Sequence, residues 1–247
     1  MPDGAQLAEL KRIAIVPALN EEATVGRVID EIRAFDPGFD VVVVDDGSTD
    51  RTAGIAADRG AYVVRLPFNL GIGGAVQTGY RFAFEHGYDI AVQVDGDGQH
   101  DASQLPAILG PVLAGEADLA VGSRFAGPGG YRSSFARRIG IQIFARVVSR
   151  IVRQKVTDTT SGFRAVNRKG IALFASDYPH DYPEVETTVM TVRHKLRLTE
   201  VPVTMRERGG GRSSITALRS VYYMIKVLLA IFVGLFRRNV VPQEDSA

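Results

Sequence analysis

Residues 41–50 read Val-Val-Val-Val-Asp-Asp-Gly-Ser-Thr-Asp, an apolar run that ends in a cluster of carboxylate and hydroxyl side chains. Four consecutive valines favour a buried strand, because β-branched side chains pack well in a sheet that is covered on both faces. Residues 51–59 then show a helical pattern that Thr49 or Asp50 can cap. A strand, a polar turn and a helix in direct succession predict a βα unit of a parallel sheet.

The same succession recurs along the first half of the chain. Further apolar runs cover residues 13–16, 62–66, 90–94 and 119–121, and helical patterns cover residues 22–35, 73–86 and 104–114. Asp101 or Ser103 can cap the last of these helices. We therefore predict an α/β fold with a doubly wound, mostly parallel, Rossmann-like sheet flanked by helices. Ligands bind such sheets beyond the carboxyl ends of the strands.

The composition excludes several classes of protein. The 247 residues are 45% hydrophobic and 23% charged, which is typical of a globular chain with a substantial core. The absence of cysteine excludes a disulfide framework, a thiolate metal site and a cysteine nucleophile. The first residues do not show the pattern of a secretory signal.

The net charge of +1 conceals an asymmetry between the two halves of the chain. Residues 1–123 hold 8 basic and 19 acidic side chains, a balance of −11, whereas residues 124–238 hold 21 and 7, a balance of +14. Such an asymmetry predicts a cation site in the first half and contacts with anions in the second.

Polar side chains follow three of the predicted strands, at residues 17–22, 45–50 and 95–100. Turn chemistry and helix capping would explain one such stretch, but three at one edge of a sheet favour a functional site. The sharpest stretch is Asp95-Gly96-Asp97, because two carboxylates in a tight turn suit Mg²⁺ or Mn²⁺, which are held by oxygen ligands and substrate phosphates. The side-chain carbonyl of Gln99 would add a third oxygen.

The sequence lacks complete versions of the other common nucleotide-binding and metal-binding motifs. In Gly71-Ile72-Gly73-Gly74 the third glycine of a dinucleotide fingerprint is replaced by Val76, and the motif follows the third strand instead of the first. We interpret it as a turn into a helix whose backbone lies near a ligand. A phosphate-binding Walker loop, a nucleophile elbow and paired zinc histidines are absent from the sequence, and we interpret the four histidines as structural or surface residues.

In order and spacing, these blocks resemble the inverting GT-A glycosyltransferases of family 2, and within it the polyprenyl- or dolichol-phosphate sugar synthases. The resemblance extends over about residues 11–215. It rests on residues 17–21, 44–50, 69–75, 95–100, 122–124 and 160–164. It implies a GT-A fold and a metal-dependent, inverting transfer of a hexose from a nucleoside-diphosphate sugar to polyprenyl phosphate.

The resemblance also implies roles for single residues. The nucleotide site would comprise Pro17, Ala18, Asn20, Glu21, Asp46, Asp95, Arg208 and Arg212, the two arginines lying in a Gly-rich segment that closes over the donor phosphates. The cation would be held by Asp95, Asp97 and Gln99. The catalytic set would comprise Asp97, Arg124 and Arg138, with Arg124 and either Arg138 or Arg137 on the acceptor phosphate.

A general base is not required for this reaction, since a phosphate monoester with a second pKa of about 6 is mostly ionised at neutral pH. This agrees with the absence of an evident pair of histidine and carboxylate. Glu184 or Glu186 would serve as the base for a hydroxyl acceptor, but their position at the start of a helix explains them equally well.

The basic half contains two segments that suit a membrane surface. Residues 135–154 predict a helix with Ile139, Ile143, Val147 and Ile151 along one side and Arg138, Arg146, Arg150 and Arg153 along another. Residues 221–236 are almost wholly apolar, but the ten residues after Lys226 are too few to span a bilayer. This favours a helix in the membrane interface over a core helix.

We expect a tail at 1–10, a GT-A catalytic domain at 11–215, an amphipathic, apolar interface helix at 216–238 and a tail at 239–247. The expected partners are a nucleoside-diphosphate sugar, polyprenyl phosphate and an anionic membrane surface, together with a small membrane protein or a second copy of the chain, and no nucleic acid. The expected location is the cytoplasm, peripheral on the inner face of the cell membrane. The alternatives are a soluble family 2 transferase with a saccharide or small hydroxyl acceptor, and a non-catalytic scaffold that binds nucleotide sugars.

Overall fold

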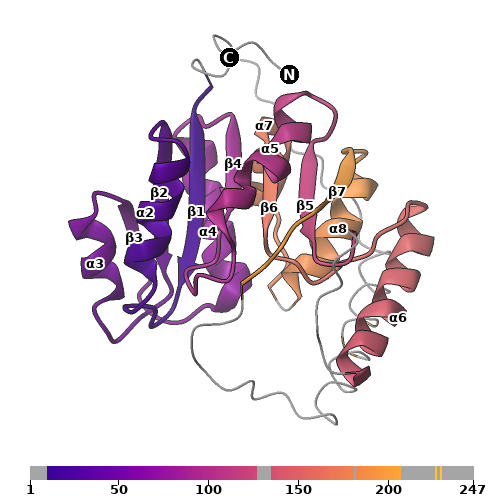
Figure 1. The fold of residues 1–247 in the computed structure, drawn as a ribbon, viewed down its shortest axis with the longest axis horizontal. Coiled ribbons are helices and arrows are strands. Elements are labelled where there is room, and N and C mark those ends of the chain that lie inside the picture. Colours follow the sequence, from indigo (N-terminus) through magenta and orange to yellow (C-terminus); the bar gives the residue numbers. More distant parts are fainter. Residues whose placement is uncertain (1–9, 127–134, 181, 207–225, 227–228, 230–247) are drawn as a thin grey trace.

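Within the described part of the chain, seven strands form one mixed sheet (Figure 1). The structure, a computed structural model, describes residues 10–126, 135–180, 182–206, 226 and 229, with only the backbone of residues 135–141. The strands are β1 (Arg12–Ala18), β2 (Phe39–Asp45), β3 (Tyr62–Arg65), β4 (Ile90–Gln93), β5 (Leu119–Ser123), β6 (Arg164–Asn167) and β7 (Leu198–Pro202). Their order in the sheet is β3-β2-β1-β4-β6-β5-β7.

The five strands predicted from the apolar runs are present as β1 to β5. β1 pairs in parallel with β2 and β4, β2 pairs in parallel with β3, and β5 pairs in parallel with β7. β6 runs antiparallel to both of its neighbours, β4 and β5. The predicted α/β fold with a mostly parallel sheet is therefore confirmed. The antiparallel strand β6 and the edge strand β7 are additions that the sequence patterns do not indicate.

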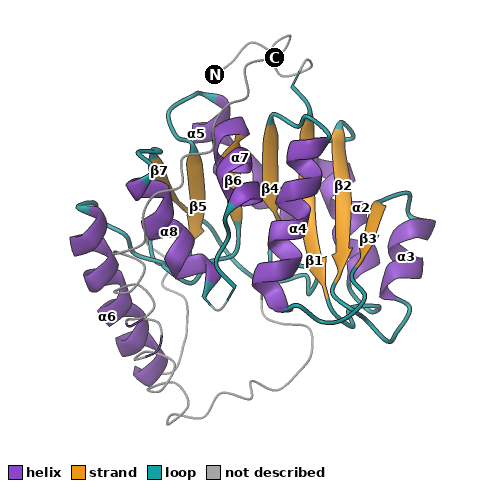
Figure 2. Cartoon of the chain, turned by 180° about the vertical axis from the view of Figure 1, so that it is seen from behind, coloured by secondary structure: helices purple, strands orange, loops and turns teal. Residues whose placement is uncertain are grey.

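Helices cover both faces of the sheet, as Figures 1 and 2 show from opposite sides. They are α2 (Val25–Phe35), α3 (Thr52–Asp58), α4 (Gly71–Glu85), the short 3-10 turn η1 (Ala102–Gln104), α5 (Leu105–Leu113), α6 (Phe135–Val152), α7 (Arg168–Ser176) and α8 (Pro183–Arg193). Side chains alternate along β1, so that Ile13 and Ile15 pack with α4, α7 and α8, whereas Ala14 and Val16 pack with α2 and α5. All four are fully buried, which fixes β1 at the centre of both cores.

Two of the predicted helix caps lie near the carboxyl edge of the sheet. Asp101 caps η1, and its carboxylate accepts a hydrogen bond from the Ser103 N–H. Asp50 accepts from the Thr52 N–H in the first turn of α3, although the cap position itself is taken by Arg51. Both aspartates therefore hold the turns that precede the helices, but the predicted caps are wrong in position, because Arg51 is the N-cap residue of α3 and Gln104 that of α5.

The helix predicted over residues 135–154 is present as α6. Among the residues of α6 whose side chains are described, Phe144, Val148 and Val152 are buried, and they belong to the core that also contains residues of α8. Ile143 is instead exposed, on the same side as Arg146 and Arg150. The apolar residues on α6 form two stripes, and the stripe with the larger Phe144 faces the core.

In the described part of the chain, the helices fall short of the length and hydropathy that crossing a bilayer requires. The predicted helix at 216–238 lies outside the described residues except for Lys226 and Leu229, both of which are helical. The Lys226 ammonium lies 5.7 Å from the centre of the Tyr182 ring, so this part of the chain reaches the start of α8.

Candidate active site

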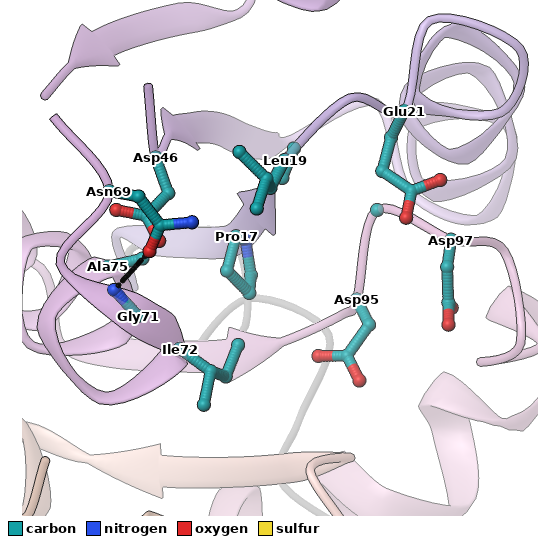
Figure 3. A pocket seen from close by; sticks show the side chains of 12 residues that line it. Pro17, Leu19, Glu21, Asp46, Asn69, Gly71, Ile72, Ala75, Asp95 and Asp97 are labelled. Carbon is teal, nitrogen blue, oxygen red and sulfur yellow. Dashed lines mark hydrogen bonds between the residues drawn. The ribbon is translucent and has the colours of Figure 1, made fainter. Parts of the chain in front are cut away.

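A pocket of about 290 Å³ lies at the carboxyl ends of β1, β2 and β4, beside the first turn of α4. This is the edge at which parallel sheets bind ligands. Its lining residues are Pro17, Ala18, Leu19, Glu21, Asp46, Asn69, Gly71, Ile72, Ala75, Asp95, Gly96 and Asp97 (Figure 3). All three of the polar stretches that follow predicted strands contribute to it, so the structure brings together the residues that the sequence singled out at this edge.

The end of β1 supplies Pro17 and Ala18 to the pocket and the loop after it supplies Glu21, but Asn20 is not among the lining residues. The Asn20 side chain accepts hydrogen bonds from Thr49, and its own N–H donates to the Ser48 hydroxyl at 2.9 Å. Its backbone has a φ of 55°, a left-handed conformation that asparagine adopts more readily than most residues. Asn20 therefore joins the loops after β1 and β2.

Asp46 lines the pocket and also fixes its wall. The side chain is 4% exposed, and its two oxygens accept from the N–H groups of Leu70 at 2.7 Å and Gly71 at 3.0 Å. These N–H groups belong to the start of α4, where the helix leaves its first donors unpaired. Asp46 thereby holds Gly71 and Ile72 against the pocket, which agrees with the expectation that this backbone lies near a ligand.

The loop after β4 brings two carboxylates, Asp95 and Asp97, to the same pocket (Figure 3). Asp97 accepts a hydrogen bond from the Gln99 N–H at 3.0 Å, and Gly98 has a φ of 74°, a conformation that glycine adopts without steric cost. Gln99 is not among the lining residues, and its backbone carbonyl accepts from the Arg206 N–H. The structure thus brings two of the three predicted cation ligands to the pocket.

The donor set suits a hard divalent cation that substrate phosphates help to hold. Across the residues that the structure describes, no group of three or more His, Cys, Asp or Glu side chains could hold a metal ion alone. Mg²⁺ and Mn²⁺ are commonly held by one or two carboxylates plus phosphates and waters, and Asp95 and Asp97 fit that arrangement.

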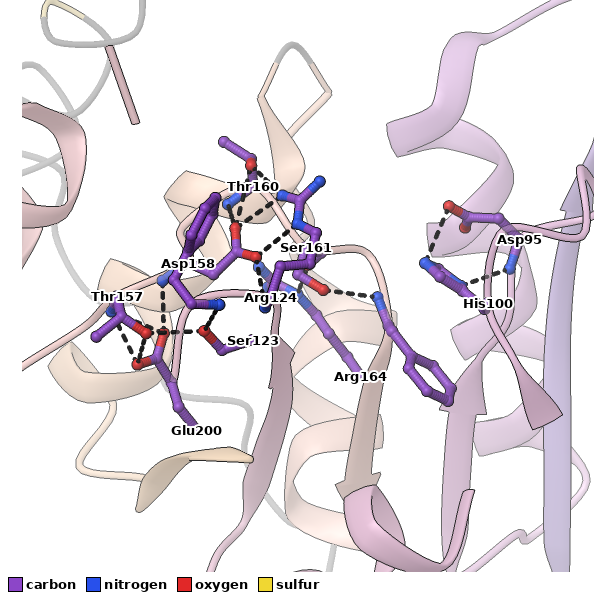
Figure 4. A network of polar contacts seen from close by, with 12 residues as sticks. Asp95, His100, Ser123, Arg124, Thr157, Asp158, Thr160, Ser161, Arg164 and Glu200 are labelled. Carbon is purple, nitrogen blue, oxygen red and sulfur yellow. Dashed lines mark hydrogen bonds and ion pairs between the residues drawn. The ribbon is translucent and has the colours of Figure 1, made fainter. Parts of the chain in front are cut away.

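A second polar cluster surrounds Arg124, at the end of β5 (Figure 4). The Nε and Nη2 atoms of Arg124 donate to the two carboxylate oxygens of Asp158 at 2.7 and 2.8 Å, and Nη2 also donates to the Thr160 hydroxyl. Burial alone would raise the pKa of Asp158, but the hydrogen bonds and charge of Arg124 outweigh it and lower that pKa. Arg124 therefore occupies a fixed position.

Glu200 on β7 holds the chain segment that carries Asp158. Its carboxylate accepts from the N–H groups of Thr157 and Asp158, and the Thr157 hydroxyl also contacts the Ser123 hydroxyl at 2.8 Å (Figure 4). Neither Asp158 nor Glu200 stands out in the sequence. Their partners lie 34 to 43 residues away, so local patterns give no signal for them.

Arg164, in the last of the motif blocks, is a buried cation next to the site. It is 1% exposed and donates to the carbonyls of Ser161 and Glu184 and to the Thr187 hydroxyl. Burial raises the pKa of Glu184, a shift that Arg164 opposes and Asp95 increases. Glu184 and Glu186 both lie in the first turn of α8, as the alternative interpretation of these residues expects.

The remaining predicted arginines lie at the margin of the described residues. Arg138 belongs to α6, where the backbone alone is described, and Arg208 and Arg212 lie outside the described residues. Arg206, just before them, pairs with Glu31 at 2.7 Å and with Asp101 at 2.9 Å. These ion pairs place Arg206 beside Asp101, which directly follows the loop that carries the two carboxylates.

His100 contacts Asp95, a residue that lines the pocket, and the sequence interpretation did not indicate this contact. The structure places His100 within the loop after β4, 4% exposed and in contact with Asp95 (Figure 4). Its position five residues after Asp95, behind a Gly-containing turn, is the signal that would have placed it there.

A family profile and two relatives that match this sequence are named as glycosyltransferases or as a sugar-phosphate synthase. The profile of glycosyl transferase family 2 matches residues 13–174. The undecaprenyl-phosphate mannosyltransferase of Micrococcus luteus is 34% identical over 84% of this chain and 88% of its own length. The polyprenol monophosphomannose synthase of Mycolicibacterium smegmatis is 30% identical over 88% of this chain and 85% of its own.

Among solved structures, glucosyl-3-phosphoglycerate synthase from Mycobacterium tuberculosis, in complex with Mn²⁺ and UDP-glucose, superimposes with a TM-score of 0.67 at 25% identity. The match covers 93% of this chain and 80% of that one.

Proposed function

Because the chain belongs to glycosyl transferase family 2 and is a nucleotide-sugar-dependent glycosyltransferase, we propose that it transfers a hexose from a nucleoside-diphosphate sugar to polyprenyl phosphate. The observation that carries this proposal is the pocket at the carboxyl edge of the sheet, into which Asp95 and Asp97 bring two carboxylates. Relatives named for sugar transfer to polyprenyl phosphates, at about a third identity over most of the chain, support the choice of acceptor.

In this proposal the donor occupies the pocket. Pro17, Ala18 and Glu21 lie along the nucleotide, with Asp46 at the base or ribose. Asp95 and Asp97 hold Mg²⁺ or Mn²⁺ together with the donor diphosphate. The bound cation would offset the negative charge that develops on the departing nucleoside diphosphate. A related structure with bound Mn²⁺ and UDP-glucose supports this assignment.

The acceptor phosphate acts as the nucleophile. One of its oxygens attacks the anomeric carbon while the bond from that carbon to the diphosphate oxygen breaks, and the nucleoside diphosphate leaves with the electron pair. Attack from the face opposite the leaving group inverts the anomeric configuration. Because this phosphate is mostly ionised at neutral pH, the reaction needs no general base.

Arg124 is assigned to the acceptor phosphate in this proposal. Asp158 and Thr160 hold its guanidinium in one orientation, and a preorganised cation binds a phosphate at a low cost in conformational entropy. Asp158 also offsets part of the charge of Arg124, so a second cation is needed for a doubly charged phosphate. Arg138 or Arg137 is the proposed partner, with Arg208 and Arg212 on the donor phosphates.

A peripheral position on the inner face of the cell membrane would give the enzyme access to a polyprenyl phosphate. The exposed side of α6 carries Arg146 and Arg150 next to Ile143, a combination that suits an anionic lipid surface. The predicted interface helix at 216–238 would add apolar contact with the lipid.

A hydroxyl acceptor is the second candidate, and Glu184 is the observation that favours it. A carboxylate whose pKa is raised by burial is a stronger base than an exposed one, and the charge of Asp95 contributes to that shift. Under this alternative, Glu184→Gln would abolish transfer. Under the phosphate-acceptor proposal it would leave a large part of the activity.

An assay of acceptor specificity distinguishes these functions. Donor nucleotides are first screened by thermal shift with Mn²⁺, and the stabilising donor is then offered with polyprenyl phosphate, with polyprenol and with saccharides. We expect product with polyprenyl phosphate only. Transfer to polyprenol or to a saccharide at an equal rate would contradict the proposal, and donor binding without any turnover would indicate a non-catalytic scaffold.

A further inference from the structure

Gln93 and His100 each face a different carboxylate oxygen of Asp95. The Gln93 amide donates to Asp95 Oδ1 at 3.0 Å. The His100 Nε2 atom faces Asp95 Oδ2 at 3.6 Å (Figure 4). Gln93 is 2% exposed and His100 is 4% exposed, so water does not readily replace either contact.

The hydrogen bond at His100 Nδ1 indicates which nitrogen of the neutral ring carries the proton. The backbone N–H of Asp95 donates to His100 Nδ1 at 3.0 Å. Since Nδ1 accepts this hydrogen bond, the neutral imidazole carries its proton on Nε2. The positive end of the Nε2–H dipole is therefore directed towards the carboxylate of Asp95. One aspartate thus engages both nitrogens of the ring.

The ring itself is held in place by packing. It stacks on the fully buried Phe163 ring, with the two centroids 4.8 Å apart and the planes 18° from parallel. The backbone of His100 also forms a bridge with Met205. His100 therefore has little freedom to turn away from Asp95.

Gly162 allows the segment beside this carboxylate to approach closely. A Cβ atom at this position would lie 2.9 Å from the Gln93 amide nitrogen and 3.3 Å from Asp95 Oδ2. Any larger residue would displace either the amide or the carboxylate. The packing around Asp95 is thus adapted to hold its carboxylate in one orientation.

We propose that His100 and Gln93 are positioning residues that aim the Asp95 carboxylate at the divalent cation of the sugar donor. This inference rests on the proposed function, in which Asp95 is a cation ligand. Outer-sphere partners that orient a ligand typically change metal affinity or activity by about 10- to 100-fold when they are removed. Neither residue lines the pocket, so both would act through Asp95.

The test measures Mn²⁺ affinity directly, from the electron paramagnetic resonance signal of free Mn²⁺ during a titration. The full chain is used in the presence of the nucleoside diphosphate that stabilises the wild type. His100→Asn keeps an oxygen that can accept from the Asp95 N–H but removes the group that faces the carboxylate. Gln93→Met keeps the length of the side chain and removes its donor, and it serves if the histidine variant does not fold.

His86→Asn is the matched control. His86 is an exposed histidine at the end of α4, where its ring bonds the Phe82 carbonyl, remote from the pocket. We expect His100→Asn and Gln93→Met to bind Mn²⁺ about 10- to 100-fold more weakly than the wild type, and His86→Asn to bind it equally well. Excess Mn²⁺ should also restore sugar transfer by His100→Asn, which loss of a purely structural contact would not allow.

Asp95→Asn and Asp97→Asn separate this inference from the function on which it rests. If both aspartate variants lose Mn²⁺ while His100→Asn and Gln93→Met bind it like the wild type, the positioning role is wrong and the cation site stands. If the aspartate variants bind Mn²⁺ as tightly as the wild type, the cation site itself is wrong.

Discussion

Replacing Asp158 by asparagine should destabilise the protein strongly, because it removes the buried carboxylate that pairs with the guanidinium of Arg124. The Asp158 side chain is fully buried, and the Arg124 side chain is 10% exposed. The carboxylate accepts three hydrogen bonds from Arg124 and two from Thr160. Breaking a buried ion pair by removing one partner costs about 3–5 kcal/mol, a large part of a typical total stability of about 5–15 kcal/mol.

The assay is urea unfolding at neutral pH, with Asp30→Asn as the matched control. Asp30 pairs with Arg59 on the surface, where the two side chains are 59% and 39% exposed, so its removal should cost less than about 1 kcal/mol. Adding Arg124→Met to Asp158→Asn should recover much of the loss, since the unpaired charge is then gone. If Asp158→Asn lowered the free energy of unfolding by as little as Asp30→Asn does, the reasoning would be refuted.

The same pair gives a pH dependence with a definite sign. The pKa of Asp158 is lower in the folded state than the ordinary value of about 3.9. Its contribution to stability is therefore complete above the unfolded pKa and is lost as the pH falls through the folded pKa. The stability of Asp158→Asn should fall less steeply than that of the wild type below about pH 4, and parallel curves would contradict this.

Three further predictions concern the reaction and the membrane. Asp97→Asn should lower the transfer rate by at least about 100-fold with the fold intact, because cation charge stabilisation is worth several kcal/mol, and full activity in EDTA would count against it. Arg124→Ala should weaken use of the phosphate acceptor more than donor affinity measured by calorimetry, and the reverse would show that its role is misassigned. The full chain should float with anionic liposomes, less at high salt, whereas a truncation before Ala217 should not float. Equal flotation of both would place residues 216–238 in the core or an oligomer interface.

Much of the fold could be predicted because its signals are local. Continuous apolar runs mark β1, β2 and β4 as buried strands, and the carboxylates that follow β2 and β4 mark the edge where the pocket lies. β6 escaped prediction because Arg-Ala-Val-Asn contains only two apolar residues, between a charged and a polar one. β7 escaped because it is an edge strand with a partly exposed pattern.

The parts of the site that could not be predicted depend on contacts between distant segments. Glu200 holds Thr157 from 43 residues away, and nothing near either residue in the sequence indicates the other. The packing face of α6 depends on such contacts as well, because its sequence holds two apolar stripes and the neighbouring core contacts the one with Phe144. His100 lies close to Asp95 in sequence, but its role depends on the ring of Phe163, which β6 brings to it.

The most direct test of the proposed function is the metal dependence of sugar transfer into polyprenyl phosphate. A radiolabelled nucleotide sugar is incubated with the purified full chain and polyprenyl phosphate, with added Mn²⁺ or with EDTA, and label is counted in the organic extract. The pocket with Asp95 and Asp97 predicts a labelled polyprenyl phosphate sugar with Mn²⁺ and none with EDTA. Equal labelling under both conditions, or labelling that requires a hydroxyl acceptor in place of the phosphate, would contradict the proposed function.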